Sequence, residues 1–263
     1  MRASLVVPTL NESESIGHVL KTFRRAAEEA NRTLFATAPL EWEVLVIDGA
    51  STDGTAAIAT AEGARVIVER RKGYGRAYKT GFAAAQGEVI ATADGDATYP
   101  VETIPALVRR LLDERIEFLT GDRMAFVSRD AMTTEHRVGN RVLNLTLGVL
   151  FHRYVAELPG GALKDSQSGF WVFRREILDR VHLEDNGMPF SEELKIEAML
   201  RGVRIVEVPI QYGERWGRPK LSSWRDGYRN LMFIVRKRFR VARESTRGQP
   251  VPFAHGPDAV PPP

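Results

Sequence analysis

The fold follows most directly from two stretches of the sequence, EVLVIDGASTDGT at residues 43–55 and EVIATADGDATYP at residues 88–100. Each begins with a short apolar run and then reaches acidic residues in a turn, which is the pattern of a buried strand in a parallel sheet. A third apolar run, LVVP, occupies residues 5–8, and segments with helical spacing lie between the runs, at residues 13–30, 52–62 and 75–86. This alternation predicts an α/β fold with a doubly wound, mostly parallel sheet, whose ligand site lies beyond the carboxyl ends of the strands.

The rest of the chain continues the pattern more loosely. We expect further helices at residues 101–114, 136–151 and 192–201, and further strands at residues 65–68, 117–120, 170–173 and 204–210. Pro209 places the last of these strands near an edge of the sheet. The last 16 residues contain six prolines and little apolar periodicity. The expected organisation is an α/β domain over residues 1–221, a basic amphipathic helix over 222–247 and a disordered Pro-rich tail over 248–263.

The composition is that of an ordinary globular protein, with 43% hydrophobic and 27% charged residues in a chain of 263. The absence of cysteine excludes disulfides and thiolate metal sites. No apolar run approaches the ~18 residues that span a bilayer, and Pro8 ends the first run too early for a signal peptide. We therefore expect a protein that is made and kept in the cytosol.

Charge is unevenly distributed along the chain. Residues 215–247 contain eleven Arg or Lys residues against Asp226 and Glu244, a local net charge of +9 in a chain whose total is +3. The remainder is therefore acidic overall. The sequence combines an acidic body with a basic C-terminal segment.

The most distinctive acidic turn holds Asp94 and Asp96, directly after the strand expected at residues 88–93. Two carboxylates separated by one residue in a turn can both face one hard divalent cation. Mg²⁺ or Mn²⁺ held there could then bridge to phosphate oxygens. The alternative is an acidic turn that only caps the helix beginning at Val101.

Two other strands also end in polar and acidic residues, and each of these turns could serve only as a helix cap. The common position of the three turns favours a functional role over simple capping, because all three fall at the edge where such sheets bind ligands. The residues are Pro8, Asn11 and Glu12 after the first strand, and Asp48 and Asp53 after the second.

A loop of cations and glycines, ERRKGYGRA at residues 69–77, precedes the helix expected at residues 75–86. With Lys72 and Gly73 before a helix N-terminus, the loop suits an anionic diphosphate. The alternative is a solvated basic loop. The sequence Gly-x-x-x-x-Gly-Lys-Ser/Thr does not occur, which argues against a nucleoside triphosphatase.

Together these motifs resemble those of inverting family 2 glycosyltransferases with a GT-A fold, and among them the polyprenyl-phosphate (dolichol-phosphate) sugar transferases. The resemblance covers roughly residues 4–225. It implies that Asp94 and Asp96 form the family's Asp-x-Asp metal site for Mg²⁺ or Mn²⁺. It also implies a set of donor-nucleotide ligands: Pro8, Asn11, Glu12, Asp48 and Asp53.

Later motifs resemble the acceptor side of the same family. Gly121-Asp122-Arg123 is similar to its Gly-x-Arg element, and Arg137 with Gly139-Asn140 is similar to its Arg-x-Gly-Asn element. Both are expected to bind the acceptor phosphate. Asp165 to Phe170, DSQSGF, looks like the Asp-x-x-Ser-Gly-Phe stretch of the acceptor side. In RWGRPKL, residues 215–221, the cations Arg215 and Lys220 are expected to close over the diphosphate.

The implied reaction moves a hexose, mannose or glucose, from a nucleotide-diphosphate sugar to a polyprenyl phosphate. The metal, Arg215 and Lys220 would neutralise the charge that grows on the leaving diphosphate. An acceptor phosphate is already a nucleophile at neutral pH, because its second pKa is about 6. Arg123 and Arg137 would position it without a general base. A sugar hydroxyl would instead need a carboxylate base, for which Asp165 and Glu193 are the candidates.

Residues 225–243 predict an amphipathic helix in which an apolar stripe lies beside an arc of five arginines. Such a helix suits an anionic membrane surface, so the enzyme would attach peripherally at the cytoplasmic face or through a membrane partner subunit. The alternative is a terminal helix packed on the enzyme body. The stripe consists of Tyr228, Leu231, Met232, Val235, Phe239 and Ala242, with Phe233 and Ile234 outside it.

Three other functions are compatible with parts of the sequence. The chain could be a family 2 transferase for a saccharide or a small soluble acceptor. It could be an inactive membrane-binding homologue, although every acidic position expected of an active enzyme is filled. A nucleic-acid surface would leave Asp48, Asp94 and Asp96 unexplained, so no nucleic-acid partner is expected.

Overall fold

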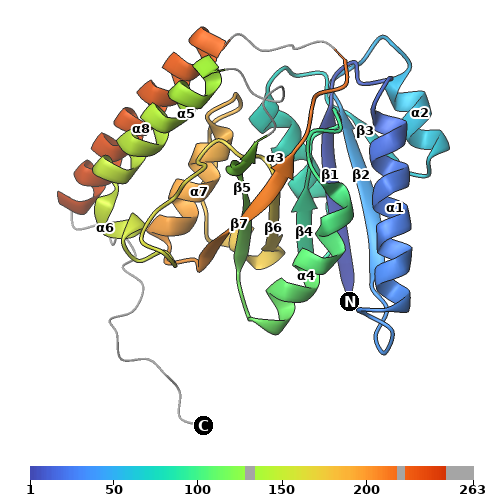
Figure 1. Ribbon diagram of the computed structural model, residues 1–263. Helices are drawn as coiled ribbons and strands as arrows, with labels where there is room; N and C mark the ends of the chain where they lie inside the picture. The colour runs from blue at the N-terminus through green and yellow to red at the C-terminus, as the bar shows by residue number, and fades with distance from the viewer. Residues whose placement is uncertain (128–133, 218–222, 247–263) are drawn as a thin grey trace.

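The structure is a computed structural model that describes residues 1–127, 134–217 and 223–246. Within these residues the chain builds one seven-stranded sheet in the order β3-β2-β1-β4-β6-β5-β7, with helices on both faces (Figure 1). Both the tail predicted over residues 248–263 and Lys220 lie outside the described residues. The strands are β1 (Arg2–Thr9), β2 (Glu41–Asp48), β3 (Arg65–Val68), β4 (Val89–Thr92), β5 (Phe118–Val127), β6 (Trp171–Arg174) and β7 (Ile205–Tyr212).

Strand direction confirms the doubly wound, mostly parallel sheet. The pairs β1 with β2, β1 with β4, β2 with β3 and β5 with β7 are parallel. Only β6 runs against its neighbours β4 and β5. Because of that reversal, the loop before β6, and not the loop after it, lies at the edge where β1, β2 and β4 end. Residues 163–170 are thereby brought to the ligand-binding edge.

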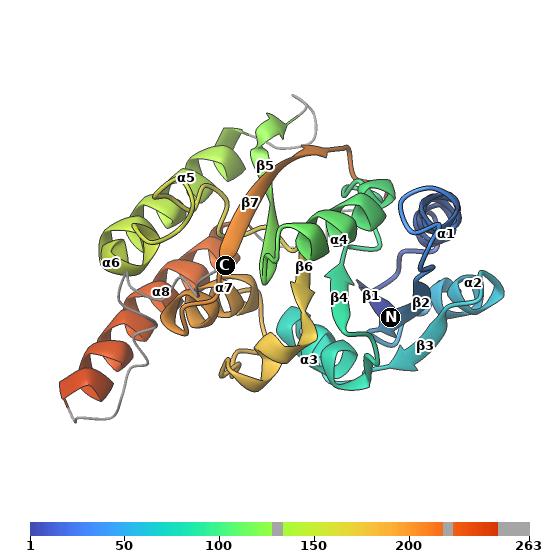
Figure 2. The same cartoon turned by 90° about the horizontal axis from the view of Figure 1, so that it is seen from below.

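Helices cover the sheet on two sides, which Figure 2 separates. On one side lie α1 (Ile16–Arg32), α2 (Thr55–Ala61) and α4 (Ile104–Asp113), with a short 3-10 turn, η1 (Val101–Thr103), before α4. On the other side lie α3 (Tyr74–Ala84) and α7 (Phe190–Leu200). A second 3-10 turn, η2 (Arg175–Asp179), follows β6.

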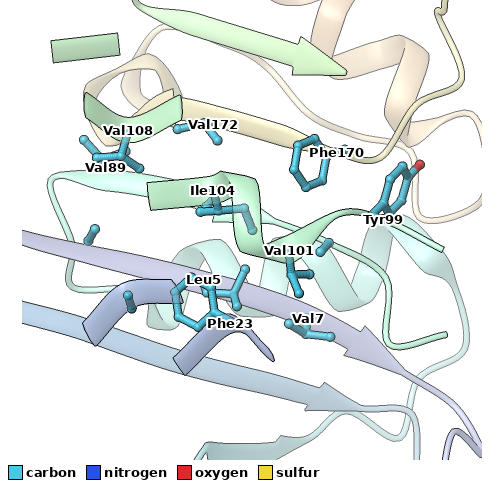
Figure 3. Close-up of a cluster of buried hydrophobic side chains, with 14 of the residues drawn as sticks. Leu5, Val7, Phe23, Val89, Tyr99, Val101, Ile104, Val108, Phe170 and Val172 are labelled. Atoms are coloured by element: carbon cyan, nitrogen blue, oxygen red, sulfur yellow. The ribbon is translucent and has the colours of Figure 1, made fainter. Parts of the chain in front are cut away.

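Two hydrophobic clusters fill the space between the sheet and these helices. Leu5 and Val7 on β1 point into the cluster beneath α1 and α4, which Figure 3 shows, whereas Val6 between them joins the cluster on the α3 side. This alternation is the two-residue period of a strand buried on both faces. It explains why the apolar runs in the sequence are continuous.

One strand is longer than the sequence predicts. β5 continues to Val127, beyond the end of the strand expected at residues 117–120. The ladder to β7 shifts register after Asp122 and resumes at Phe126 opposite Gln211. The extension depends on a partner strand that lies about 80 residues later in the chain, and no local pattern announces it. β7 is an edge strand, as Pro209 predicts.

Three helices form an outer layer beyond α7: α5 (Thr134–Leu150), α6 (His152–Val155) and α8 (Ser223–Thr246) (Figure 1). α8 packs on the rest of the molecule, which agrees with the alternative of a terminal helix packed on the enzyme body. Among residues 225–243, the side chains that it buries are Asn230, Ile234, Lys237 and Val241. Ile234 was placed outside the expected apolar stripe, so the stripe is not the face that meets the body. None of the described helices is both long and apolar enough to cross a membrane.

Candidate active site

The turns after β1 and β2 are joined by hydrogen bonds. The hydroxyl of Thr9 and the hydroxyl of Ser51 donate to Asp48 Oδ1, at 3.2 and 2.6 Å, and the amide of Ser51 donates to Asp48 Oδ2 at 2.9 Å. The Asn11 side-chain oxygen accepts a hydrogen bond from the backbone amide of Thr52 at 2.8 Å, and the backbone amide of Asn11 donates to Ser51 Oγ. Asp48 is 2% exposed. In this structure it holds the two turns together.

Asp53 makes a second link between the same turns. Its carboxylate accepts from the amide of Ser13 at 3.0 Å and from the amide and hydroxyl of Thr55, at 3.1 and 2.5 Å. Desolvation acts to raise the pKa of Asp53, but these hydrogen bonds outweigh it and hold the pKa well below its ordinary value. Asp53 therefore stabilises the turn and the start of the next helix, which is the structural alternative that the sequence left open. This role does not exclude a contact to the donor nucleotide.

Each of the three strand-end turns contains a non-glycine residue with a left-handed backbone. The φ angles are 51° at Asn11, 61° at Ala50 and 63° at Ala97. This conformation is uncommon for residues with a Cβ and costs on the order of 1 kcal/mol or more. Such strain persists where the surroundings fix it, and it is concentrated here at one edge of the sheet.

Asp96 lies in a nearly buried group of charges at the centre of that edge. Its Oδ1 accepts from the amide and hydroxyl of Thr98, at 3.1 and 2.6 Å. Its Oδ2 lies 3.0 Å from Arg215 Nη2, and the same nitrogen lies 3.2 Å from Glu12 Oε1. Asp96 and Glu12 are only 3% and 6% exposed. The structure therefore brings together three predicted donor-site residues that are up to 203 positions apart.

Asp94 is the second carboxylate of the pair. The hydroxyl of Tyr78 lies 3.4 Å from its Oδ1. Burial, followed by the charge of Asp96, raises the pKa of Asp94 to about 7, although Arg215 and Arg123 act in the opposite direction. Burial therefore disfavours the ionised form of Asp94 by more than the nearby arginines favour it.

These residues fit a divalent ion shared with a phosphate ligand. Asp94 and Asp96 supply two hard oxygen ligands whose mutual repulsion a cation would relieve. Within the described ranges, no group of three or more His, Asp or Glu side chains is placed to hold a metal alone. That agrees with Mg²⁺ chemistry, in which one or two carboxylates are completed by substrate phosphates and water.

A segment after β7, residues 213–217, crosses this carboxylate pair. The amide of Gly213 donates to Thr98 O at 2.9 Å, and the amide of Trp216 donates to Asp96 O at 3.0 Å. The indole of Trp216 stacks on the imidazole of His18, with ring centres 4.7 Å apart. The backbone of this segment thereby fixes where Arg215 meets Asp96. A cavity of about 760 Å³ beside it is lined by His18, Tyr99 and Tyr212, but by none of the carboxylates described above.

Arg123 is fixed at the acceptor side by Asp165. Nε and Nη2 of Arg123 donate to the two carboxylate oxygens at 2.7 and 2.8 Å, and the Arg123 amide adds a third bond at 3.0 Å. The guanidinium also lies 5.4 Å from the centre of the Tyr212 ring. Asp165 is fully buried, and Lys195 Nζ donates to its backbone oxygen at 2.6 Å.

This arrangement argues against both candidate bases. Burial acts to raise the pKa of Asp165, but the charge and hydrogen bonds of Arg123 hold it below its ordinary value. Both of its oxygens are occupied by Arg123, so we correct its role to that of a residue that positions Arg123. Glu193, 1% exposed, accepts the amides of Glu184 and Asp185 on Oε2, at 3.0 and 2.8 Å, and its Oε1 lies 3.9 Å from Lys237, so it is engaged within the fold.

The remaining predicted residues lie apart from this cluster or beyond the described chain. Lys72 is exposed before α3. Gly73 has φ of +136°, and a Cβ there would lie 2.0 Å from Asn186 O, so only glycine fits. The first amides of α3 are used by the protein itself, because Arg76 donates to Asn186 O at 3.1 Å. Arg137 lies half-buried in the first turn of α5.

Three tyrosines around Asp94, of which Tyr78 and Tyr99 are buried and Tyr74 is half-buried, were not predicted from the sequence. Tyr74 and Tyr78 are one turn apart on α3, with ring centres 4.8 Å apart, and Tyr78 reaches Asp94. The hydroxyl of Tyr99 accepts from the amide of Gly169 at 2.9 Å. Gly169 packs so closely that a Cβ there would lie 2.1 Å from the Tyr74 hydroxyl. The signal available was the i, i+4 spacing of Tyr74 and Tyr78, but Tyr74 directly precedes the helix expected at residues 75–86, and such a pair also suits an ordinary core.

Comparisons with known proteins agree with this geometry. A model of glycosyl transferase family 2 matches residues 4–181. The low-salt glycan biosynthesis hexosyltransferase Agl6 of Haloferax volcanii is 33% identical over 234 residues, which are 88% of this chain and 52% of that protein. The dolichyl-phosphate hexose transferase of the same organism is 33% identical over 224 residues, 85% of this chain and 88% of that protein. The chain thus spans about half the length of the first relative and most of the second.

Solved structures share the architecture. Glucosyl-3-phosphoglycerate synthase from Mycobacterium tuberculosis, in complex with Mn²⁺, UDP and glucosyl-3-phosphoglycerate, has a TM-score of 0.69 at 24% identity and covers 90% of this chain and 79% of that chain. The same synthase with Mg²⁺ and UDP has a TM-score of 0.66 at 23% identity. At this identity the likeness shows a GT-A-like α/β fold.

Proposed function

Because the chain belongs to glycosyl transferase family 2, we propose that it transfers a hexose from a nucleotide-diphosphate sugar to a polyprenyl phosphate. The observation that carries the proposal is the cluster of Asp94, Asp96, Glu12 and Arg215 at the carboxyl edge of the sheet, with Arg123 beside it. One relative that matches this chain over most of both lengths is a dolichyl-phosphate hexose transferase.

On the donor side, Asp94 and Asp96 would hold Mg²⁺ or Mn²⁺. The ion, when bound, would supply positive charge against the diphosphate leaving group. Arg215 already lies 3.0 Å from Asp96, so a diphosphate at this edge would meet a guanidinium held in place. Arg215 can then offset the charge that develops as the glycosidic bond breaks.

On the acceptor side, Arg123 is presented by a buried carboxylate. Asp165 takes Nε and Nη2 of Arg123 and fixes the plane of the guanidinium. A guanidinium fixed in this way suits a phosphate, because Arg recognises phosphate through parallel N–H donors. The phosphate oxygen would attack the anomeric carbon directly and release the nucleoside diphosphate, with inversion.

The occupied carboxylates favour a phosphate over a sugar hydroxyl as the acceptor. A hydroxyl needs a base within reach, and both Asp165 and Glu193 are committed to internal contacts. A phosphate monoester needs none at neutral pH.

A donor and acceptor panel tests the proposal. Radiolabelled UDP-glucose and GDP-mannose are incubated with the protein, Mg²⁺ or Mn²⁺, and a polyprenyl phosphate, and the organic phase is counted. Label is expected in the organic phase, and Asp96→Asn should remove it. Label that stays in a small water-soluble product would establish the soluble-acceptor alternative instead.

A further inference from the structure

Glu207 is a carboxylate in the middle of an apolar stretch of β7. Successive residues of a strand point to opposite faces of the sheet. Val206 and Val208 pack in the cluster beneath α1 and α4, whereas Ile205 packs in the cluster on the α3 side. Glu207 therefore points, like Ile205, to the side of the sheet that carries α7. A carboxylate there is costly unless it has partners, and the proposed reaction gives it no role.

The partners of Glu207 are two successive backbone amides in the loop before β6. Its Oε2 accepts from the amide of Lys164 at 2.7 Å, and its Oε1 accepts from the amide of Asp165 at 2.9 Å. Burial raises the pKa of Glu207, and these two amides and the charge of Lys195 act in the opposite direction. Glu207 thereby holds the backbone that carries Asp165, from a strand 42 positions later in the chain.

Lys195 of α7 holds the carbonyl oxygen of the same residue. Its Nζ donates to Asp165 O at 2.6 Å, and the side chain of Lys195 is fully buried. Burial lowers the pKa of Lys195 to about 8, and the charges of Asp165 and Glu207 act against the decrease. The amide and the carbonyl oxygen of Asp165 are thus both bonded to charged side chains, one from β7 and one from α7.

These contacts lead directly to the acceptor-side guanidinium. The carboxylate of Asp165 takes Nε and Nη2 of Arg123 at 2.7 and 2.8 Å, so it sets the plane of the guanidinium. Charge-assisted hydrogen bonds of this kind are short and directional. Because the Asp165 side chain is short, a shift of its backbone moves the carboxylate and turns Arg123 with it. The position of Glu207 therefore bears on the direction in which Arg123 points.

The same loop has a further contact that does not involve Glu207. Asn144 of α5 accepts from the amide and the hydroxyl of Ser166, at 2.9 and 2.6 Å, through its Oδ1. A change at Glu207 therefore leaves the next residue of the loop attached. The expected consequence is a displaced Asp165 in a folded protein.

We propose that Glu207 is a positioning residue of the acceptor site: from β7 it fixes the backbone of Asp165, which Lys195 holds at the carbonyl oxygen, and so orients Arg123 toward an acceptor phosphate. The inference rests on the proposed function for the identity of that ligand. The orientation of Arg123 by Glu207 does not depend on it.

NMR of ¹⁵N-labelled arginine side chains tests the positioning without turnover. The Nε–H of Arg123 donates to Asp165, so it should give a slowly exchanging resonance, which Arg123→Lys removes. In Glu207→Gln, which keeps one carbonyl oxygen for two amides, this resonance should shift and exchange about fivefold faster, the effect of losing about one hydrogen bond. Glu207→Ala keeps no acceptor and should show a larger change.

Glu43→Gln is the matched control. Glu43 is also a half-buried strand carboxylate, and it accepts from the amide of Gln86 at 2.9 Å and from the hydroxyl of Ser4 at 2.7 Å. It lies near the start of β2, at the edge of the sheet opposite the site. Its loss should leave the Arg123 resonance unchanged.

Steady-state kinetics with a polyprenyl phosphate measure the functional consequence. Glu207→Gln should raise the acceptor KM by about fivefold, because a turned guanidinium pairs less well with the phosphate. The donor KM and kcat should change by less than about twofold, because the contacts of Glu207 lead to the acceptor side. Loss of stability alone would reduce the amount of active enzyme and leave both KM values unchanged.

The outcomes separate positioning from the proposed function. An unchanged Arg123 resonance in Glu207→Gln overturns the proposal, as does an equal change in Glu43→Gln or an equal rise in both KM values. A wild-type protein that transfers no sugar to polyprenyl phosphate would refute the proposed function, and the Arg123 resonance would still decide whether Glu207 orients Arg123. Thermal unfolding of each variant checks that its fold is unchanged.

Discussion

At the scale of single residues, the structure separates carboxylates with similar sequence signals into two kinds. Asp48 and Asp53 have their oxygens occupied by neighbouring amides and hydroxyls, and Asp165 is occupied by Arg123. Asp96 is held by Thr98 and Arg215, whereas the pKa of its neighbour Asp94 is raised, first by burial and then by the charge of Asp96. Asp94 is therefore the carboxylate of the pair that would gain most from a bound cation.

Asp96→Asn is expected to reduce kcat by about a hundredfold or more, on the scale of removing one electrostatic stabiliser of a transition state. The amide keeps the shape of the side chain and removes its charge, so the fold should survive. Initial rates at saturating donor, with the Tm of each protein, measure the effect. Glu102→Gln, at an exposed carboxylate six residues later, is the control and should match wild type. Equal rates for both variants would refute the metal-site assignment.

Asp165→Asn distinguishes a positioning residue from a base. Losing one anionic partner should loosen Arg123 and raise the KM for the polyprenyl phosphate by about tenfold, with a smaller effect on the donor KM. The pH dependence of kcat should keep its shape, because no proton passes through Asp165. A lost acidic limb in the pH profile would restore Asp165 to the role of base.

At the scale of elements, α7 is unusual because every one of its residues is buried, including Glu192, Glu193, Lys195 and Glu197. A helix buried all round is normally apolar. Here the charges meet partners from elsewhere in the chain: Lys195 donates to Asp165 O, and Lys237 of α8 lies 2.6 Å from Glu197. α7 thereby links the Arg123–Asp165 pair to the outer helices.

The buried carboxyl of Glu192 predicts a pH dependence of stability. Burial raises its pKa to about 8, so the folded state keeps a proton that the unfolded state releases near pH 4.5. The stabilisation by the protonated Glu192 carboxyl is fully present below the pKa of this group in the unfolded state. It is lost as pH rises through about 8, at up to about 1.4 kcal/mol per pH unit. Lys195, whose pKa is lowered to about 8, stays charged in both states over most of this window.

Urea unfolding from pH 5 to 8 measures this dependence. Glu192→Gln keeps a carbonyl oxygen for the hydrogen bond from Gln167 and removes the titration, so its free energy of unfolding should fall less steeply with pH than that of wild type. Parallel curves for the two proteins would mean that Glu192 is ionised in the folded state at neutral pH.

At the scale of the whole molecule, α8 belongs to the same folding unit as the sheet, although the sequence sets it apart by charge. Ile234 and Val241 lie in the core cluster that includes Trp171 of β6 and Phe190 of α7. Lys237 is 5% exposed between Glu193 and Glu197. Removing α8 would therefore open the core as well as remove a surface.

Lys237→Ala should lower the free energy of unfolding by about 3–5 kcal/mol, because it removes the cation between two buried carboxylates and leaves Glu197 with Arg201 alone. Near-UV and far-UV circular dichroism should still report one coincident transition. Arg240→Ala is the matched control: its partner Glu184 is half-exposed, so the loss should be about 1 kcal/mol or less. Similar losses in the two variants would contradict the buried role of Lys237.

The sequence by itself determined the order of strands and helices and the three polar turns, because apolar periodicity and turn chemistry are local. It also determined that Asp94, Asp96, Asn11 and Asp48 would gather at one edge, since parallel strands end together. The family expected from these motifs is confirmed. The metal, the lipid acceptor and the roles of Arg123 and Arg137 remain predictions.

Only the tertiary structure decided the direction of β6, which carries Asp165 to Arg123, and the length of β5, which depends on β7. It also decided which carboxylates are consumed by internal contacts and which face of α8 is buried. A helical wheel ranks faces by apolar content, but burial depends on the partners that a face meets. For α8 those partners include Gln167 and the carboxylates of α7, so a partly polar face turned inward and the aromatic face was left to solvent.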